Sequence, residues 1–417
     1  MKIILIRIIS LFSFISIVFS ESPGATFLLI PPSPTMNGLG GIGVCLPSYD
    51  PYSSYFNPAN GLNFVKETTF SHSKMTTPWL KNLGDSNFEY EVWNFGILLS
   101  KIKPIKFVGR FHKTFLNSNL QNSKAYAFTF GVGHRYNIMK IPVDISSGFT
   151  TKLTNMNVRN DDSHEEGEGY STDMFFDIGL LLASPYSMNL FPNTKPGSIL
   201  NKFDVNLISA FGYSVSNIGR NIDFIDADQA QPAPKYLRTG ISFTTNISYK
   251  SDWNLIEWRG GRSASDALIK SYENPIKYQN GFGDVNFIDN VIMSNSDPLV
   301  IIHRGFELTL FDYYTFRKGR KIDNFGHINL ETIGCGYNSD GMFKLISFCL
   351  SFIALVNENQ SLRDISQTTN IIPKYINIRY NYSEWNDLPG HPLDNTEFES
   401  WLITFRNIDR LIAKVFK

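Results

Sequence analysis

The 417-residue sequence is poor in cysteine and in charged side chains. Its three cysteines, Cys45, Cys335 and Cys349, are too few to form a disulfide framework in a chain of this length. Charged residues make up 18% of the chain, and 38 basic residues balance 38 acidic ones. Lysine and arginine are scattered along the sequence, so no basic patch indicates nucleic acid as a partner.

The motifs of common enzymes and metal sites are also missing. The seven histidines never fall at metal-ligand spacing, which argues against a zinc site. No Gly-x-Ser-x-Gly nucleophile motif occurs, and no Walker-type lysine follows a glycine-rich loop. We therefore expect no enzyme, no catalytic residue, no metal and no cofactor.

A hydrophobic run follows two basic residues within the first 20 positions. Lys2 and Arg7 precede an apolar run that ends at Phe19, and Val18 and Ser20 suit cleavage after Ser20. This pattern predicts a secretory signal peptide over residues 1–20. Since no later segment reaches about 18 uninterrupted apolar residues, we expect no transmembrane helix in the mature chain.

Aromatic residues, in contrast, make up 14% of the chain and alternate with small residues. In residues 125–133, large side chains alternate with small ones: Tyr126, Phe128, Phe130 and Val132 against Ala125, Ala127, Thr129, Gly131 and Gly133. The same alternation recurs in residues 240–249, 346–352, 376–382 and 401–405. Each of these segments is predicted to be a β-strand, and the last one closes on Phe405.

Strict alternation with large outward side chains favours a transmembrane β-barrel, since one strand face meets lipid and the other a lumen. Tyrosines at the strand ends would form an interfacial aromatic girdle. A soluble β-sandwich also alternates and is the competing interpretation. For the barrel, the predicted inward side chains are small and leave room in the lumen; they include Ala127, Thr129, Gly131, Ser242, Thr244 and Ser347.

Polar, turn-rich insertions are predicted between the strands, at residues 155–172, 223–235, 259–298 and 358–373. Residues 263–272 could form a helix within one of them, capped by Ser263. Another contains an acidic cluster, Asp161, Asp162, Glu165, Glu166 and Glu168, which either binds calcium or is a solvated loop tip; the spacing of a calcium loop is missing. The strand register places Cys349 inward and Cys335 outward, which predicts no disulfide between them.

Residues 37–62 combine a glycine cluster with prolines. A phosphate-binding loop would need a strand before its glycines and a helix after them, and the flanking prolines fit neither. Glycine here is better explained by close backbone packing inside a barrel. The motif residues are Gly38, Gly40, Gly43, Asp50, Asn57 and Pro58.

These residues, with Ala25, Phe27 and Leu28 before them, resemble the amino-terminal signature of the PorV/PorQ family, relatives of FadL-type outer-membrane transporters. Further similar segments follow in order: Phe-Phe-Asp-Ile-Gly at 175–179, Ser-Asn-Ile-Gly at 216–219, and Arg-Gly-Phe-Glu at 304–307. Residues 259–298 have no counterpart. The resemblance implies a FadL-like barrel of 14 strands, with a hatch at residues 21–62, a barrel at 63–405 and a short extension at 406–417.

The resemblance leaves two functions open. As a type IX secretion component in the outer membrane of a Gram-negative-type bacterium, the chain would recognise the carboxy-terminal signal domains of exported cargo. Its partners would then be outer-membrane lipid, other secretion components and that cargo. As a FadL-type passive transporter, it would carry hydrophobic small molecules across the membrane. A structural role is the third possibility.

Overall fold

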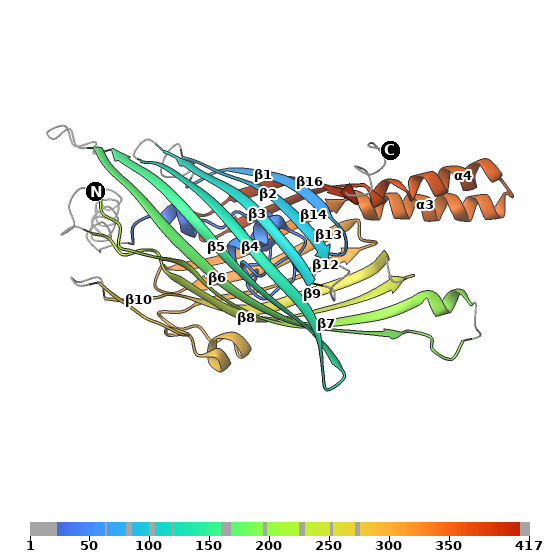
Figure 1. Ribbon diagram of the computed structural model, residues 1–417, viewed down its shortest axis with the longest axis horizontal. Helices are drawn as coiled ribbons and strands as arrows, with labels where there is room; N and C mark the ends of the chain where they lie inside the picture. The colour runs from blue at the N-terminus through green and yellow to red at the C-terminus, as the bar shows by residue number, and fades with distance from the viewer. Residues whose placement is uncertain are drawn as a thin grey trace.

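A computed structural model of the chain describes residues 23–62, 65–80, 86–99, 105–118, 121–159, 168–194, 198–224, 230–250, 253–271 and 276–408. Fourteen strands pair with their neighbours in antiparallel fashion, and β1 pairs with β16 to close a barrel (Figure 1). The barrel strands are β1 (Thr69–Pro78), β2 (Asn87–Leu99), β3 (Ile105–Asn117), β4 (Gln121–Ile138), β5 (Ile141–Arg159), β6 (Glu168–Asn189), β7 (Phe203–Gly219), β8 (Tyr236–Tyr249), β9 (Trp253–Ala267), β12 (Ile301–Leu310), β13 (Tyr314–Asp323), β14 (Ile328–Asn338), β15 (Ile376–Asn386) and β16 (Thr396–Arg406). The predicted fold class, a transmembrane antiparallel β-barrel of 14 strands, is confirmed.

The two faces of each strand differ as the alternation predicts. On β4, Phe128 and Phe130 on the outer face are 60% and 55% exposed, whereas Ala125 and Ala127 are buried. Closure satisfies the backbone hydrogen bonds of every strand, and the apolar outer face is the one that a bilayer requires. The predicted strands at residues 125–133, 240–249, 376–382 and 401–405 all belong to this wall.

The two ends of the barrel differ in their connections. At one end, called the terminal end, β1 begins and β16 ends. Most strands are joined there by short turns, such as that between Ile138 and Ile141, and residues 339–375 form a long insertion at this end. At the other, called the loop end, longer segments such as residues 220–235 and 268–300 connect the strands. Near the terminal end the outward rings of Tyr337, Tyr380 and Trp401 follow one another, with centroids 6.5 and 4.9 Å apart, as expected of an aromatic girdle.

A helical hairpin at the terminal end overturns one predicted strand. Residues 346–352 lie in helix α3 (Ser339–Val356), which packs against α4 (Gln360–Thr369) and projects beyond the barrel (Figure 1). For an apolar run of seven residues, periodicity alone does not distinguish a strand from a helix. The missed signal lies upstream, where the Asn338 side chain caps the helix by accepting a hydrogen bond from the Asp340 amide.

Several further expectations change with this hairpin. Ser347 faces Ser366 of α4 instead of the lumen, with their hydroxyl oxygens 3.0 Å apart, and Cys349 is exposed on a helix instead of pointing inward. Cys335 does lie on the outer face with Ile333 and Tyr337, and all three cysteines are free. Helix α3 is long enough and apolar enough to cross a membrane, judged by length and composition alone, and it is the one such helix within the described residues. The sequence had predicted no helix of this kind.

The predicted helix at residues 263–272 is also wrong. Pairing with β8 and β12 extends β9 through Ala267, and Ile269–Ser271 forms β10, which pairs with β11 (Lys277–Tyr278). The predicted insertions shrink for the same reason, because β5 and β6 remain paired up to Arg159 and Glu168. The insertion at residues 358–373 is largely α4.

The segment between β9 and β12 covers part of the outer wall at the loop end. Leu268, Val285 and Val291 pack against Leu237 and Ile302, which stand on the outer face of β8 and β12. A side chain of the wall also reaches the segment, since the Arg262 guanidinium donates to the Ile292 carbonyl at 2.5 Å. This segment is the one for which the sequence offered no family counterpart.

Candidate functional site in the barrel lumen

Residues 24–62 run through the barrel lumen and are called the lumenal segment. At the loop end, the Gly24 amide donates to the Pro232 carbonyl at 3.0 Å. The segment contains the short helices η1 (Thr26–Leu29), α2 (Pro34–Asn37) and η2 (Pro51–Tyr55), and it appears in blue inside the ring of strands (Figure 1). Most of its side chains are buried, including Met36, Leu39 and Ile42 with no exposed surface.

Glycines on the inner wall let the lumenal segment approach the strands directly. A Cβ added at Gly179 would lie 2.1 Å from Asn57 Oδ1, and one at Gly212 would lie 2.0 Å from the Val44 carbonyl oxygen. Two rows of paired glycines run across neighbouring strands, Gly131, Gly148 and Gly179 in one and Gly261, Gly305 and Gly319 in the other. The wall therefore fits this segment backbone against backbone.

Asn57 and Asn60 tie the second half of the segment together. The Asn57 side-chain amide donates to the Val44 carbonyl and to the Leu180 carbonyl of β6, both at 2.9 Å, and Pro58 packs over Gly148 and Gly179. Asn60 donates to two carbonyls of the segment at 3.0 and 2.8 Å and accepts from two amides at 3.0 and 2.8 Å. Both side chains are fully buried, so these hydrogen bonds are hard to replace.

The other motif residues lie in the same half of the segment. Gly38 and Gly40 are bound to Thr332 of β14, which donates to the Gly38 carbonyl at 3.0 Å and accepts from the Gly40 amide at 3.1 Å. Gly43 faces the Phe56 ring. Asp50 caps η2, accepting from the Tyr52 amide at 3.0 Å and from the Ser33 hydroxyl. Burial raises the pKa of the Asp50 carboxyl, while these two hydrogen bonds act in the opposite direction.

Charged side chains of the wall hold the segment as well. Glu307 of β12 pairs with Arg259 and, at 2.9 Å, with Arg317, and Arg259 donates to the Pro47 carbonyl at 3.0 Å. Arg110 of β3 donates to the Asn60 carbonyl at 2.7 Å. Residues 38–60, held in this way by polar contacts and glycine packing, are called the anchor.

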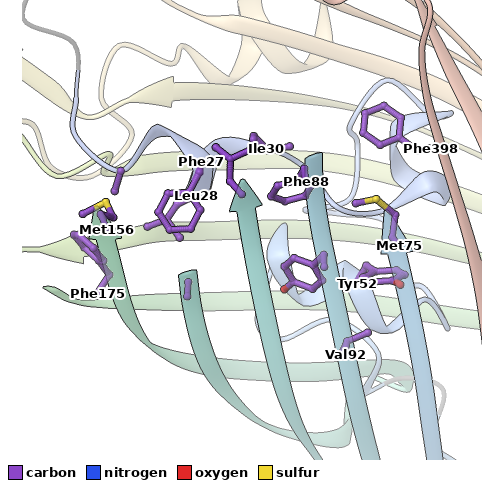
Figure 2. Packing of buried hydrophobic residues seen from close by; sticks show 14 of the residues in the cluster. Phe27, Leu28, Ile30, Tyr52, Met75, Phe88, Val92, Met156, Phe175 and Phe398 are labelled. Atoms are coloured by element: carbon purple, nitrogen blue, oxygen red, sulfur yellow. The ribbon is translucent and has the colours of Figure 1, made fainter. Parts of the chain in front are cut away.

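The first part of the segment is held differently. Phe27, Leu28 and Ile30 pack between apolar side chains of opposite walls, among them Met75, Phe88, Met156, Phe175 and Phe398 (Figure 2). These side chains come from the loop-end halves of their strands. They close the lumen at that end with an apolar layer, called the seal.

A cavity of about 210 Å³ lies between the lumenal segment and the wall, bordering the seal. Leu29, Asn37, Tyr55 and Phe56 line it from the segment. The wall contributes Tyr236, Arg238, His303, Lys321, Asp323 and Trp385. A second cavity, of about 30 Å³, is lined by His112, Lys152 and Asp177 and has room for about one water molecule.

The sequence pointed to six motif residues and to the inward Gly131, which Pro58 approaches, but not to the charged wall residues around the segment. Arg110, Arg238, His303, Glu307 and Lys321 all stand at inward positions of strands. Ionisable residues at membrane depth mark functional positions. The alternation of each strand shows which of its residues face inward. Charged residues and glycines at these inward positions could therefore have been identified from the sequence.

Within the described residues, no three His, Cys, Asp or Glu side chains gather as a metal site. The acidic cluster at residues 161–168 lies almost wholly outside the described residues, as does the predicted signal peptide at 1–20. Both stay predictions.

No protein-family model matches the chain, and no curated protein matches it. Among solved structures, the Ralstonia pickettii toluene transporter TbuX is 11% identical over 89% of this chain and 97% of its own, with a TM-score of 0.38. A Pseudomonas aeruginosa FadL homologue is 8% identical over 90% and 98%, with a TM-score of 0.37. The translocator domain of the autotransporter NalP from Neisseria meningitidis is 8% identical over 82% and 87%, with a TM-score of 0.38. Similarity at this level assigns neither a family nor a function to the chain.

Proposed function

We propose that the chain is an outer-membrane transport barrel in which the seal opens to admit small molecules from the loop end. The observation that carries this proposal is the cavity of about 210 Å³ directly beside the seal. Longer loops face the cell exterior in barrels of this type, so the seal would stand between the outside and the cavity. The anchor occupies much of the lumen beyond it, which would restrict passage to small ligands.

Two disulfide locks test which part of the lumenal segment must move. A Cβ at Gly24 would lie 3.3 Å from Gln231 Cβ, and one at Gly38 would lie 3.3 Å from Ser383 Cβ, both near disulfide geometry. Gly24→Cys with Gln231→Cys fixes the seal, and Gly38→Cys with Ser383→Cys fixes the anchor. Both pairs are made in a background in which Cys45, Cys335 and Cys349 are serine.

The measurement is uptake of small solutes by vesicles that contain the purified chain. Oxidation of the seal lock should stop uptake and reduction should restore it, whereas the anchor lock should leave uptake unchanged. Equal uptake by the oxidised and reduced seal lock would contradict the proposal.

A second candidate function is the type IX secretion role implied by the resemblance of residues 24–62 to the PorV/PorQ family. The helical hairpin favours it, because Phe352, Leu355 and Val356 are 62%, 66% and 66% exposed and suit contact with another protein. In this role the hairpin would contact a secretion component, and the chain would receive cargo by its carboxy-terminal signal domain.

Deletion of the gene should then leave such cargo in the periplasm, and Phe352→Asp with Leu355→Asp should reproduce the defect. Normal surface display of cargo in the deletion strain would exclude this role.

A further inference from the structure

Cations on the inner wall of the barrel fall into two groups, those with a carboxylate beside them and those without. Lys152, Arg259 and Arg317 each have a carboxylate within ion-pair distance, Asp177 for the first and Glu307 for the others. Arg110, Arg238 and Lys321 have no carboxylate within 4 Å among the described residues. Arg110 donates to the Asn60 carbonyl instead, whereas the buried Arg238 and the half-buried Lys321 line the large cavity. An uncompensated buried charge is costly, so its retention points to a ligand that supplies the missing charge.

Arg238 is held in place by aromatic rings and one hydroxyl. Its guanidinium lies 4.6 Å from the centroid of the Tyr236 ring and 4.9 Å from that of Tyr55, and it donates to the Ser216 hydroxyl at 2.6 Å. The residue is 7% exposed. Its charge is therefore positioned before any ligand arrives.

Lys321 approaches the same cavity from β13, with its ammonium 5.9 Å from the centroid of the Trp385 ring. Two buried polar atoms of the cavity lining also have no hydrogen-bond partner, Asn37 Oδ1 and the Tyr55 hydroxyl. Asn37 is 1% exposed, and unpartnered buried polar groups are rare in folded proteins. Asn37 and Tyr55 both line the cavity, and Asn37 has no contact with either cation among the interactions described above.

We infer that this cavity binds a small aromatic carboxylate, with Arg238 and Lys321 facing the carboxylate and the rings of Tyr55, Phe56 and Trp385 facing the apolar body. Its volume equals that of about seven water molecules, which suits a single ring and excludes a long acyl chain. That this ligand is also transported rests on the proposed function, whereas its binding in the cavity does not depend on transport.

Three probes of similar size and different charge test the binding: benzoate, benzamide and benzylamine. They are titrated calorimetrically into the purified full chain in an uncharged detergent. Benzoate should bind at least tenfold more tightly than benzamide, and benzylamine should not bind. Equal binding of benzoate and benzamide, or no benzoate binding, would overturn the inference.

Charge variants on β13 locate the site. Lys321→Met should weaken benzoate binding at least tenfold, and Asp323→Asn should strengthen it severalfold by removing the one carboxylate of the lining. Lys318→Met is the matched control, because Lys318 stands on the outer face of the same strand and is exposed. Heat-modifiable migration in electrophoresis shows that each variant is folded. Unchanged benzoate affinity in Lys321→Met would place the binding elsewhere and overturn the inference.

The two proposals fail in different ways. Charge-selective binding without uptake by vesicles would contradict the transport function and leave the site in place. Uptake of benzamide and benzoate at equal rates, with no selective binding, would contradict the site and leave transport in place.

Discussion

The seal and the anchor belong to one segment but are held by different forces. The seal is a set of apolar side chains against apolar walls, an interaction that has no preferred direction and tolerates sliding. The anchor has buried apolar side chains as well, but it adds directional hydrogen bonds and backbone contact with wall glycines, which are lost when the atoms move by a fraction of an ångström. The difference fits the proposal that the anchor stays fixed in the lumen while the seal opens.

The largest expected effect comes from the ion pairs of the wall that surround the anchor. Glu307→Gln leaves Arg259 and Arg317 buried without their shared carboxylate, and we expect the free energy of unfolding to fall by about 4 kcal/mol. Urea unfolding in lipid vesicles measures it. Glu399→Gln, on the outer face of β16, should change it by less than about 0.5 kcal/mol. Equal effects of the two changes would remove the distinction between anchor and surface.

A side chain at Gly179 tests the backbone contact. Gly179→Val would force Asn57 and Pro58 away from β6, at an expected cost of about 3 kcal/mol. Gly109→Val is the matched control, since no atom lies within 4 Å of a Cβ there. Limited proteolysis should cut the lumenal segment in the first variant and spare it in the second. If the lumenal segment resists proteolysis in both variants, the anchor can accommodate a side chain at Gly179.

Loss of one polar side chain should cost less. Asn57→Ala leaves the Val44 and Leu180 carbonyls without their donor, and we expect a loss of about 2 kcal/mol in the same unfolding assay. Asn155→Ala, exposed on the outer face of β5, provides the comparison. A change below about 0.5 kcal/mol at Asn57 would mean that water replaces its hydrogen bonds.

The smallest expected effect on stability belongs to the seal. Phe27→Leu keeps an apolar side chain and should cost about 1 kcal/mol, yet it should raise solute uptake severalfold because the seal packs less tightly. Phe128→Leu on the lipid-facing wall should leave uptake unchanged. Unchanged uptake in the Phe27 variant would mean that the seal does not limit entry.

Much of the wall could be predicted from the sequence, because each strand faces two different media. Residues 125–133 and 240–249 alternate as the outer and inner faces demand, and their orientation was correct. Residues 346–352 show the limit, since seven residues fit a strand and a helix alike until the cap at Asn338 and the partner helix α4 decide. Of the lumen, the sequence indicated the motif residues of the segment but none of the side chains that meet them.

The sequence by itself determined the class of the fold, because alternation of large and small side chains is a local property that each strand carries alone. Only the tertiary structure decided which inward residues form a site. Gly40 and His303 lie 263 positions apart, yet the Gly40 carbonyl oxygen is 2.7 Å from His303 Nδ1. Asn57 reaches Leu180 in the same way. Such contacts depend on barrel closure and strand register, which bring together residues far apart in the chain. Their spacing in the sequence does not predict that they are in contact.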